Sequence, residues 1–268
     1  MLRTVIRYTK VYIHYIKMQS MFYFTYRQGL IMGLLVDFSH SLITIVFFHV
    51  LYRNVSSIAG WSYDEMLVFV GINMFSSFAV FSTVAIRNLR HLPEKIKNGT
   101  VDLVLSRPLS SMFVLSFEQP YVVGLFGILP GIYLVSHGFY NSSGVITVQN
   151  LLASAYAFIC GYVIAVALHI AVVSLSFRWI NATTLPKIIE KLFTSYKFNP
   201  RQVYQGFARL FFTIVFPAVF MSSVPAEFLL GGIGLEWLVF ATVIALISLF
   251  CTIKVWNFMI KGYTSAGG

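Results

Sequence analysis

Three polar side chains that could do chemistry lie within long apolar stretches of this 268-residue chain: Asp37, His40 and Glu118. Asp37 and His40 are three residues apart, so a helix would place both on one face. An ionised group at the centre of a membrane helix costs about 2.5–3.5 kcal/mol, which makes any such residue a functional candidate. All three are therefore candidate intramembrane substrate contacts. A structural explanation stays open too: either acid could lie near the inner surface, be protonated, or pair with a basic residue on a neighbouring helix.

A second group of polar residues forms the run RNLRHLPEKIKNG between two apolar stretches. Pro93 suits the first turn of a helix. Glu94 and Lys97 would stand near opposite helix ends, with signs that complement the helix dipole. Gly99 is suited to ending the helix. The pattern predicts a short helix over about 93–98, followed by an extended piece or another amphipathic turn.

The composition indicates which kind of element positions these residues. The chain is 58% hydrophobic and 10% charged, whereas an average soluble domain is roughly 25% charged. The formal net charge is +10, and anionic lipid headgroups are a simpler partner for it than nucleic acid. Cys160 and Cys251 lie in apolar stretches without a CxxC motif or a Cys/His cluster, so neither a disulfide framework nor a metal site is indicated.

Apolar stretches of about 20 residues are long enough to span a bilayer as helices. We predict an all-α integral membrane protein whose residues 28–268 form a single domain of six transmembrane helices. The predicted spans are 29–52, 66–86, 111–136, 148–176, 205–224 and 237–260. Lys and Arg gather in every second polar segment, which is typical of cytoplasmic loops and predicts that both termini are cytoplasmic.

The first 27 residues carry basic side chains at a helical spacing. Arg3, Arg7, Lys10, His14 and Lys17 step by four, three, four and three residues, so they share one face of a helix. We predict an amphipathic helix that lies in the cytoplasmic interface of the membrane. The alternative is an amphipathic helix that packs on a protein.

Four segments resemble one protein family. The stretch KNGTVDLVLSRPLS, residues 97–110, resembles the G-T-hydrophobic-D…L…R-P-L signature of the permeases of bacterial ATP-binding-cassette (ABC) exporters of type 2. IAGWSYDE at 58–65 resembles the outer loop before the second span, and RLFFTIVFPAVFM from 209 resembles the fifth span. YTSAG at 263–267 is similar to the C-terminal end of these proteins. The most similar subgroup has small six-span subunits of uncharacterised permeases.

The resemblance implies a transport subunit rather than an enzyme. It implies export across the cytoplasmic membrane of a bacterium by alternating access, with a second permease subunit, which would form a homodimer or, slightly favoured, a heterodimer. ATP and Mg²⁺ would be bound by separate ABC ATPase subunits, and this chain would hold no cofactor; its sequence contains no Gly-Lys pair and hence no P-loop of the usual pattern.

By the same resemblance, the short helix would be a cytoplasmic coupling helix between spans two and three. It would dock in a groove of the ATPase. The residues implied in this contact are Arg90, His91, Glu94, Lys95, Lys97, Asn98, Gly99, Asp102 and Arg107. Without the resemblance, the same run would read as a basic inner loop that fixes topology.

A different function class stays open from the residues alone. Asp37, His40 and Glu118 could form the proton path of an ion-coupled secondary carrier. An adjacent gene for a P-loop ATPase would favour the exporter, whereas transport that an uncoupler abolishes and vanadate does not would favour the carrier.

Overall fold

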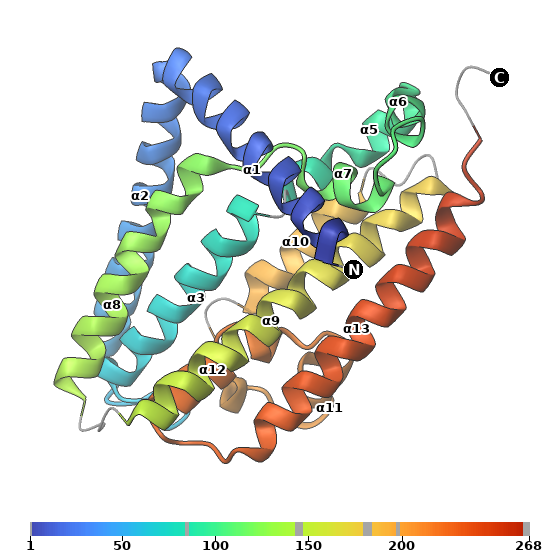
Figure 1. Cartoon of the computed structure of the whole chain (residues 1–268). Coiled ribbons are helices and arrows are strands. Elements are labelled where there is room, and N and C mark those ends of the chain that lie inside the picture. The colour runs from blue at the N-terminus through green and yellow to red at the C-terminus, as the bar shows by residue number, and fades with distance from the viewer. Residues whose placement is uncertain (1, 84–85, 143–146, 179–183, 197–198, 265–268) are drawn as a thin grey trace.

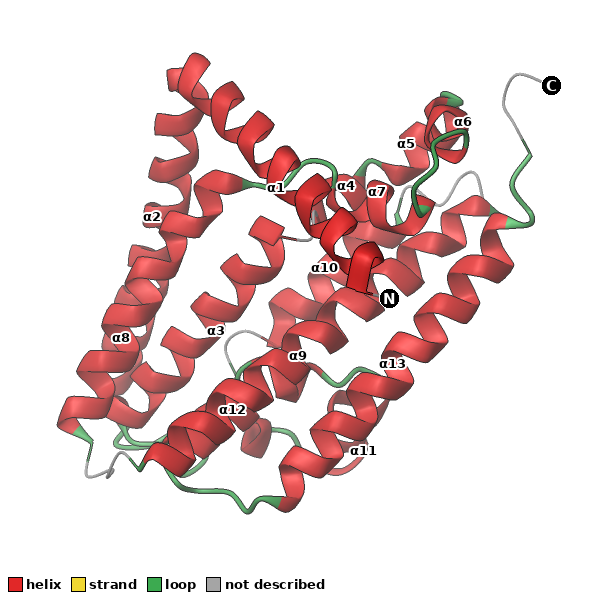
Figure 2. Cartoon of the chain, viewed as in Figure 1, coloured by secondary structure: helices red, strands yellow, loops and turns green. Residues whose placement is uncertain are grey.

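The structure is a computed structural model that describes residues 2–83, 86–142, 147–178, 184–196 and 199–264. Over these ranges the chain is helical and contains no named strand (Figure 1, Figure 2). Its longer helices are α1 (Leu2–Thr25), α2 (Arg27–Tyr52), α3 (Tyr63–Thr83), α8 (Ile128–Asn141), α9 (Val148–Ser174), α10 (Leu185–Tyr196) and α13 (Glu236–Ile260). The shorter ones are α4 (Ile86–Arg90), α5 (Leu92–Lys97), α6 (Thr100–Leu105), α7 (Ser111–Phe117), η1 (Val122–Gly127), η2 (Leu175–Phe177), η3 (Arg201–Val203), α11 (Gly206–Leu210), η4 (Phe211–Val215), η5 (Ala218–Met221) and α12 (Ser223–Leu229).

Five helical segments of the described chain are long and apolar enough to cross a membrane. They are Arg27–Tyr52, Tyr63–Thr83, Val122–Asn141, Val148–Phe177 and Glu236–Ile260. The all-helical fold expected from composition is therefore present, and these segments are consistent with an integral membrane protein. Four of these segments overlap the first, second, fourth and sixth predicted spans, because each of those stretches is a long apolar run without a helix-breaking residue in its middle.

The predicted start of the third span, 111–136, is wrong. A helix does begin at Ser111, where the Ser110 hydroxyl caps it by accepting a hydrogen bond from the Phe113 amide at 3.4 Å. That helix ends at Phe117, however, because Pro120 has no amide to donate and disfavours helical geometry in the residue before it. The apolar crossing segment starts only with η1, so Glu118 lies in the break before it.

The fifth predicted span, 205–224, is not one helix. The chain breaks at Phe216 and Pro217, and the residues on either side, 206–229, form a hairpin of α11 and η4 on one arm and η5 and α12 on the other. Ser154 donates to the Pro225 carbonyl at 2.8 Å, and a Cβ at Gly161 would lie 1.9 Å from the Phe220 carbonyl oxygen. The second arm therefore runs along α9.

The bundle has two ends, which the loops identify. We call the end that holds α4 to α7 the basic end, and the end that holds the α2–α3 and α12–α13 loops the far end (Figure 1). Glu190 on α10 lies 3.8 Å from Arg90 at the basic end. Arg201 pairs with Glu227 and lines a small pocket with Gly60 and Trp61 at the far end. Glu190 and Arg201 thus lie at opposite ends of the bundle, although the chain around them is too polar to be recognised as a span.

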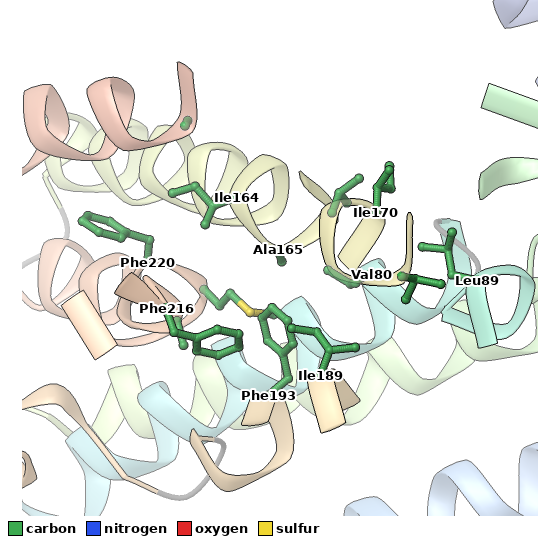
Figure 3. Packing of buried hydrophobic residues seen from close by; sticks show 14 of the residues in the cluster. Val80, Leu89, Ile164, Ala165, Ile170, Ile189, Phe193, Phe216 and Phe220 are labelled. Carbon is green, nitrogen blue, oxygen red and sulfur yellow. The ribbon is translucent and has the colours of Figure 1, made fainter. Parts of the chain in front are cut away.

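The largest apolar cluster lies where α9, α10 and the hairpin meet (Figure 3). Phe193 on α10 contacts Phe216 at the hairpin tip, with ring centroids 4.7 Å apart, and stacks on His169 of α9 at 4.3 Å. Lipid tails are as apolar as these side chains, so close packing rather than escape from water holds such a cluster together. The tip of the hairpin is therefore fixed deep in the bundle.

Small residues allow a close crossing of α3 and α8. A Cβ at Gly71 of α3 would lie 2.7 Å from the Gly131 carbonyl oxygen, and one at Gly131 of α8 would lie 2.8 Å from the Gly71 carbonyl oxygen. The two backbones therefore touch, as small residues permit in membrane bundles. This contact ties the segment after the break at Glu118 to α3.

The first helix lies across the basic end against α7. Arg7 donates to the Pro108 carbonyl at 2.7 Å, and the Tyr8 hydroxyl accepts from the Ser110 amide at 3.0 Å. Tyr12 donates to the Thr83 carbonyl at 3.1 Å, and burial raises its pKa to about 12. One side of the predicted interfacial helix is thus packed on its own chain, while Val5 and Phe24 are exposed.

Candidate functional site

Two short helices at the basic end form an angular projection. A helix occupies Leu92–Lys97, where one over 93–98 was predicted, and Pro93 stands in its first turn. Gly99 then adopts a left-handed conformation with φ of 68°, which glycine takes without strain, and α6 begins directly after it. The segment after Gly99, which was predicted as extended or amphipathic, is helical.

The two helices bury one side and expose the other. The buried side consists of Leu92, Pro93, Ile96, Val101 and Val104, so the projection is anchored by apolar contacts rather than free to swing. The exposed side contains the predicted contact residues Arg90, His91, Glu94, Lys97, Asn98 and Arg107. We call this exposed side of α5 and α6, with the flanking Arg90 and Arg107, the α5–α6 surface.

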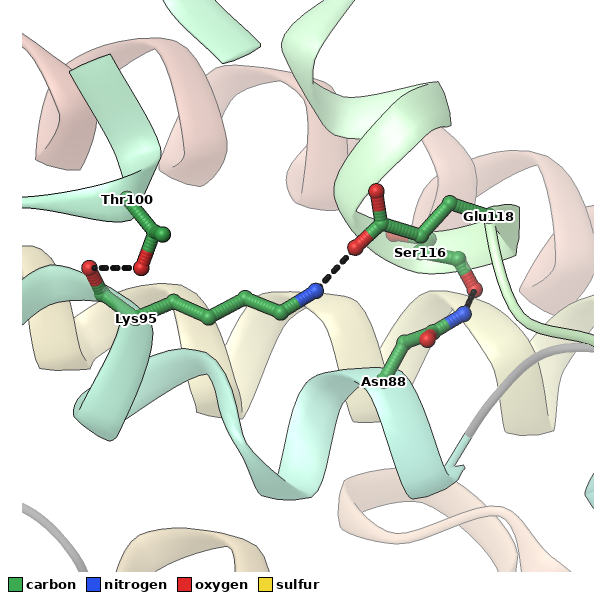
Figure 4. Close-up of polar contacts among 5 residues, drawn as sticks. All are labelled: Asn88, Lys95, Thr100, Ser116 and Glu118. Atoms are coloured by element: carbon green, nitrogen blue, oxygen red, sulfur yellow. Dashed lines mark hydrogen bonds and ion pairs between the residues drawn. The ribbon is translucent and has the colours of Figure 1, made fainter. Parts of the chain in front are cut away.

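Lys95 does not belong to the exposed side. Its ammonium group pairs with Glu118, and its carbonyl accepts a hydrogen bond from the Thr100 hydroxyl at 3.1 Å (Figure 4). Buried Asn88 lies beside this pair, where its side-chain oxygen can accept from the Gln119 amide at 3.0 Å and the Glu118 amide at 3.3 Å. Lys95, predicted as a partner contact, and Glu118, predicted as an intramembrane acid, are therefore brought together, and they join α5 to the break that precedes η1.

Asp102 likewise faces its own chain. Its carboxylate lies against Tyr263, and burial together with this negative charge raises the pKa of the Tyr263 hydroxyl. Asp102 thus connects α6 to the segment after α13. Of the acids in the predicted contact set, Glu94 is the exposed one.

Two apolar residues of the α5–α6 surface were not among the predicted contacts. Leu103 is 64% exposed and Leu105 41% exposed, although their neighbours Val101 and Val104 are buried. The helical phase of α6 decides this, since Val101 and Val104 are three residues apart and share a face. A helical rather than alternating reading of TVDLVL would have identified Leu103 as a candidate.

A cavity of about 190 Å³ lies between α2, α3 and the residue before η1. Asp37 and His40 both line it, and the Tyr121 hydroxyl donates to Asp37 Oδ2 at 3.4 Å. Tyr121 can approach α2 because Gly33 has no side chain: a Cβ there would lie 2.8 Å from the Tyr121 hydroxyl oxygen. Glu118 is not part of this lining, so the three predicted polar residues divide between two places.

No group of three or more His, Cys, Asp or Glu side chains that could hold a metal ion occurs in the described ranges. Cys160 is buried and Cys251 exposed, each as a free thiol.

The described ranges contain five long apolar helical segments and a charged projection at one end, which indicate a multi-pass membrane protein. The chain belongs to the family described as ABC-2 family transporter protein, whose family model matches residues 38–267. The resemblance to type 2 ABC permeases is thereby confirmed: the chain is a transport subunit of the membrane domain of an ABC transporter, a class that associates with ABC ATPases. No curated protein and no solved structure matches it.

Proposed function

We propose that this chain is a permease subunit of an ATP-driven exporter in the cytoplasmic membrane of a bacterium, and that the α5–α6 surface is the docking site of a separate ATPase. The observation that carries the proposal is the two-sided character of the surface. Its underside is apolar and buried, while His91, Glu94, Lys97 and Leu103 are turned outward. Such a projection offers a partner polar contacts around an exposed apolar side chain.

The distribution of charge supports a cytoplasmic location of the basic end. Lys and Arg residues there include Arg90, Lys95, Lys97, Arg107, Arg178 and Lys261. The described far end carries Arg53 and Arg201 together with Asp64, Glu65, Glu227 and Glu236. With the basic end inside, both termini are cytoplasmic.

We assign the sixth crossing to the segment 185–203 in place of 205–224. Lys187 and Lys191 of α10 are exposed on the isolated chain, on either side of Glu190, which lies 3.8 Å from Arg90. A second permease chain, of the same or a different kind, would cover this face. Substrate would then cross by alternating access at the interface between the two permeases.

The ion pairs suggest how a push on the α5–α6 surface reaches the membrane helices. The pair of Lys95 with Glu118 links α5 to the start of the η1–α8 crossing. The pair of Arg90 with Glu190 links α4 to α10. Closure of a nucleotide-driven partner would therefore move two crossings at once, while ATP and Mg²⁺ stay on the ATPase.

The test uses two exposed residues of the α5–α6 surface. The double variant Lys97→Glu, Leu103→Glu should retain its assembly but lose the ATPase on gentle purification, because neither side chain supports the bundle. Lys261→Glu is the matched control, since Lys261 is exposed at the same end outside the surface. Mass spectrometry of every co-purifying chain identifies the ATPase and any second permease.

Retention of the ATPase, and of its stimulation by the permease, in the double variant would remove the α5–α6 surface as the docking site. Purification of the unaltered chain without any P-loop protein would remove the proposal as a whole.

One observation favours the secondary carrier: Asp37 and His40 line the same cavity. Glu118, its third proposed member, is paired with Lys95, so the proton path is incomplete in this arrangement. Transport that vanadate leaves intact and an uncoupler abolishes would nevertheless decide for the carrier.

A further inference from the structure

The cavity beside Asp37 lies near the middle of the membrane. Asp37 is ten residues from the start of α2, and Asn73, which lines the opposite wall, is ten residues from the end of α3. Either count gives about 15 Å along the helix from the basic end. Since the hydrocarbon core is about 30 Å thick, the carboxylate sits at about its midplane.

At that depth a carboxylate needs a compensating positive charge or a proton. No Lys or Arg in the described part of the chain forms an ion pair with Asp37. Its polar contact is the long hydrogen bond from the neutral Tyr121 hydroxyl at 3.4 Å. The cavity therefore holds a carboxyl group that no lysine or arginine of the described chain pairs with, and His40 is the basic side chain that lines it.

The other walls of the cavity suit an organic cation. Phe78, Phe81 and Tyr121 bring aromatic rings into the lining, and such rings attract quaternary ammonium groups through their π-faces. Asn73 and Ser77 add polar groups, and Met74 an adaptable apolar one. A volume of about 190 Å³ has room for a trimethylammonium head and the first carbons of its chain.

The opening of the cavity faces the outside of the bundle. Val36 is 62% exposed and Phe81 39% exposed, and both line the cavity. Around a membrane helix this exposed surface meets lipid, so a ligand would enter from the hydrocarbon layer with its apolar tail still in it.

We propose that the cavity between α2, α3 and Tyr121 is a binding site for an amphiphilic organic cation that enters from the lipid, with Asp37 as its countercharge, and that this cation is a substrate of the transporter. The identification of the cation as a substrate rests on the proposed export function. The binding itself does not, and it can be measured separately.

The experiment measures equilibrium binding of radiolabelled decyltrimethylammonium to the whole purified complex in phosphatidylglycerol nanodiscs. The quaternary ammonium group carries no proton, so its binding distinguishes cation recognition from a proton relay. Decyl sulfate and decanol, with the same tail, test the charge of the head. We expect saturable binding of the cation that decanol and decyl sulfate do not displace.

Asp37→Asn should weaken binding of the cation at least tenfold and leave partitioning of decanol unchanged. Asp64→Asn is the matched control, because Asp64 lies at the first turn of α3 outside the cavity. This variant should bind the cation as the unaltered chain does. If Asp37→Asn fails to assemble, Gly33→Ala is the second variant. Its Cβ would lie 2.8 Å from the Tyr121 hydroxyl oxygen, so the hydroxyl must move, and binding should weaken several-fold although the carboxylate is kept. Discs that contain phosphatidylcholine show whether a lipid choline head competes for the same site.

Binding by Asp37→Asn within twofold of the unaltered chain, or equal binding of decyl sulfate, would overturn the site. ATPase co-purification is recorded on the same samples. If the ATPase is retained and the cation site fails, the export function stands without this inference; if cation binding holds and no ATPase is found, the site stands and the export function falls.

Discussion

Two ion pairs at opposite ends of the bundle hold their surroundings in different ways. At the far end, Arg201 makes two hydrogen bonds of 2.6 Å to Glu227, and its guanidinium lies 4.3 Å from the centre of the Trp237 ring. The side chains of this pair are 15% and 5% exposed. At the basic end, Lys95 meets Glu118 through a single ammonium group, and these side chains are 21% and 18% exposed.

The two ends differ in the number of contacts that must break before the helices there can move, and the far end has more. The planar guanidinium fixes Glu227 in distance and direction, whereas a lysine ammonium acts as a point charge on a flexible stem. The Arg201 amide also donates to the Ser223 hydroxyl at 2.9 Å, so Arg201 is joined to the 206–229 hairpin at several points. The far end is thus held by more contacts than the basic end, which under the proposed function would transmit the displacement.

The largest effect should follow from breaking the far-end pair. Glu227→Ala leaves Arg201 mostly buried without its carboxylate, and removal of one partner of a buried pair costs about 3–5 kcal/mol. The thermal unfolding midpoint of the purified chain in nanodiscs should fall accordingly. Glu236→Ala, an exposed acid at the same end, should shift the midpoint little; similar shifts for the two variants would show that the pair does not hold the hairpin.

The contact of the hairpin with α9 gives the next effect. Gly161→Ala would place a methyl group 1.9 Å from the Phe220 carbonyl oxygen, and such overpacking costs about 1–3 kcal/mol or more. Gly29→Ala is the matched control, because a Cβ at Gly29 meets nothing within 4 Å and alanine favours a helix. Unfolding monitored by tryptophan fluorescence should separate the two variants; equal stability would mean that the second arm does not lie on α9.

The parts of the fold that could be predicted from the sequence are those that depend on local patterns. The helices α2, α3, α9 and α13 follow from long apolar runs, and α5 follows from Pro93 and Gly99. The run 205–224 is also apolar, yet its break at Pro217 turns it into a hairpin, while α10 packs between α9 and the hairpin tip despite Lys187 and Lys191. Hydropathy describes the surroundings of a segment only when its neighbours are lipid; here they are other helices.

Contacts between residues that are distant in the sequence could not be predicted from hydropathy patterns. Asp37 and Tyr121 are 84 positions apart, and Lys95 and Glu118 are 23 apart across a break that Pro120 creates. Each residue could be singled out by its type and place, as Asp37, Lys95 and Glu118 were. Which of them meet depends on the packing of whole helices, which a single sequence does not state.

A smaller effect on stability is expected at the basic-end pair. Lys95→Ala should lower the free energy of unfolding by about 1–2 kcal/mol, since the partner carboxylate keeps some access to water. Stimulation of the ATPase by transport should fall much more than stability does, because α5 loses its link to the η1–α8 crossing. The swapped variant Lys95→Glu, Glu118→Lys should recover part of both in a double-mutant cycle; additive losses would show that the two residues act separately.

The smallest effect on stability, paired with a clear effect on coupling, should follow from Leu103→Ala. Leu103 is 64% exposed, and surface substitutions usually change stability by less than about 0.5 kcal/mol. If Leu103 fills a groove of the ATPase, its truncation removes an apolar anchor and should weaken that association about tenfold, or about 1.4 kcal/mol. Leu246→Ala is the matched control, since Leu246 is 62% exposed on α13, where the surroundings are lipid. A titration of the ATPase onto nanodiscs compares the two variants. Equal affinities would mean that exposure at the basic end has no more significance than exposure along a membrane helix, and the contrast between a transmitting end and a closed end would then rest on the ion pairs alone.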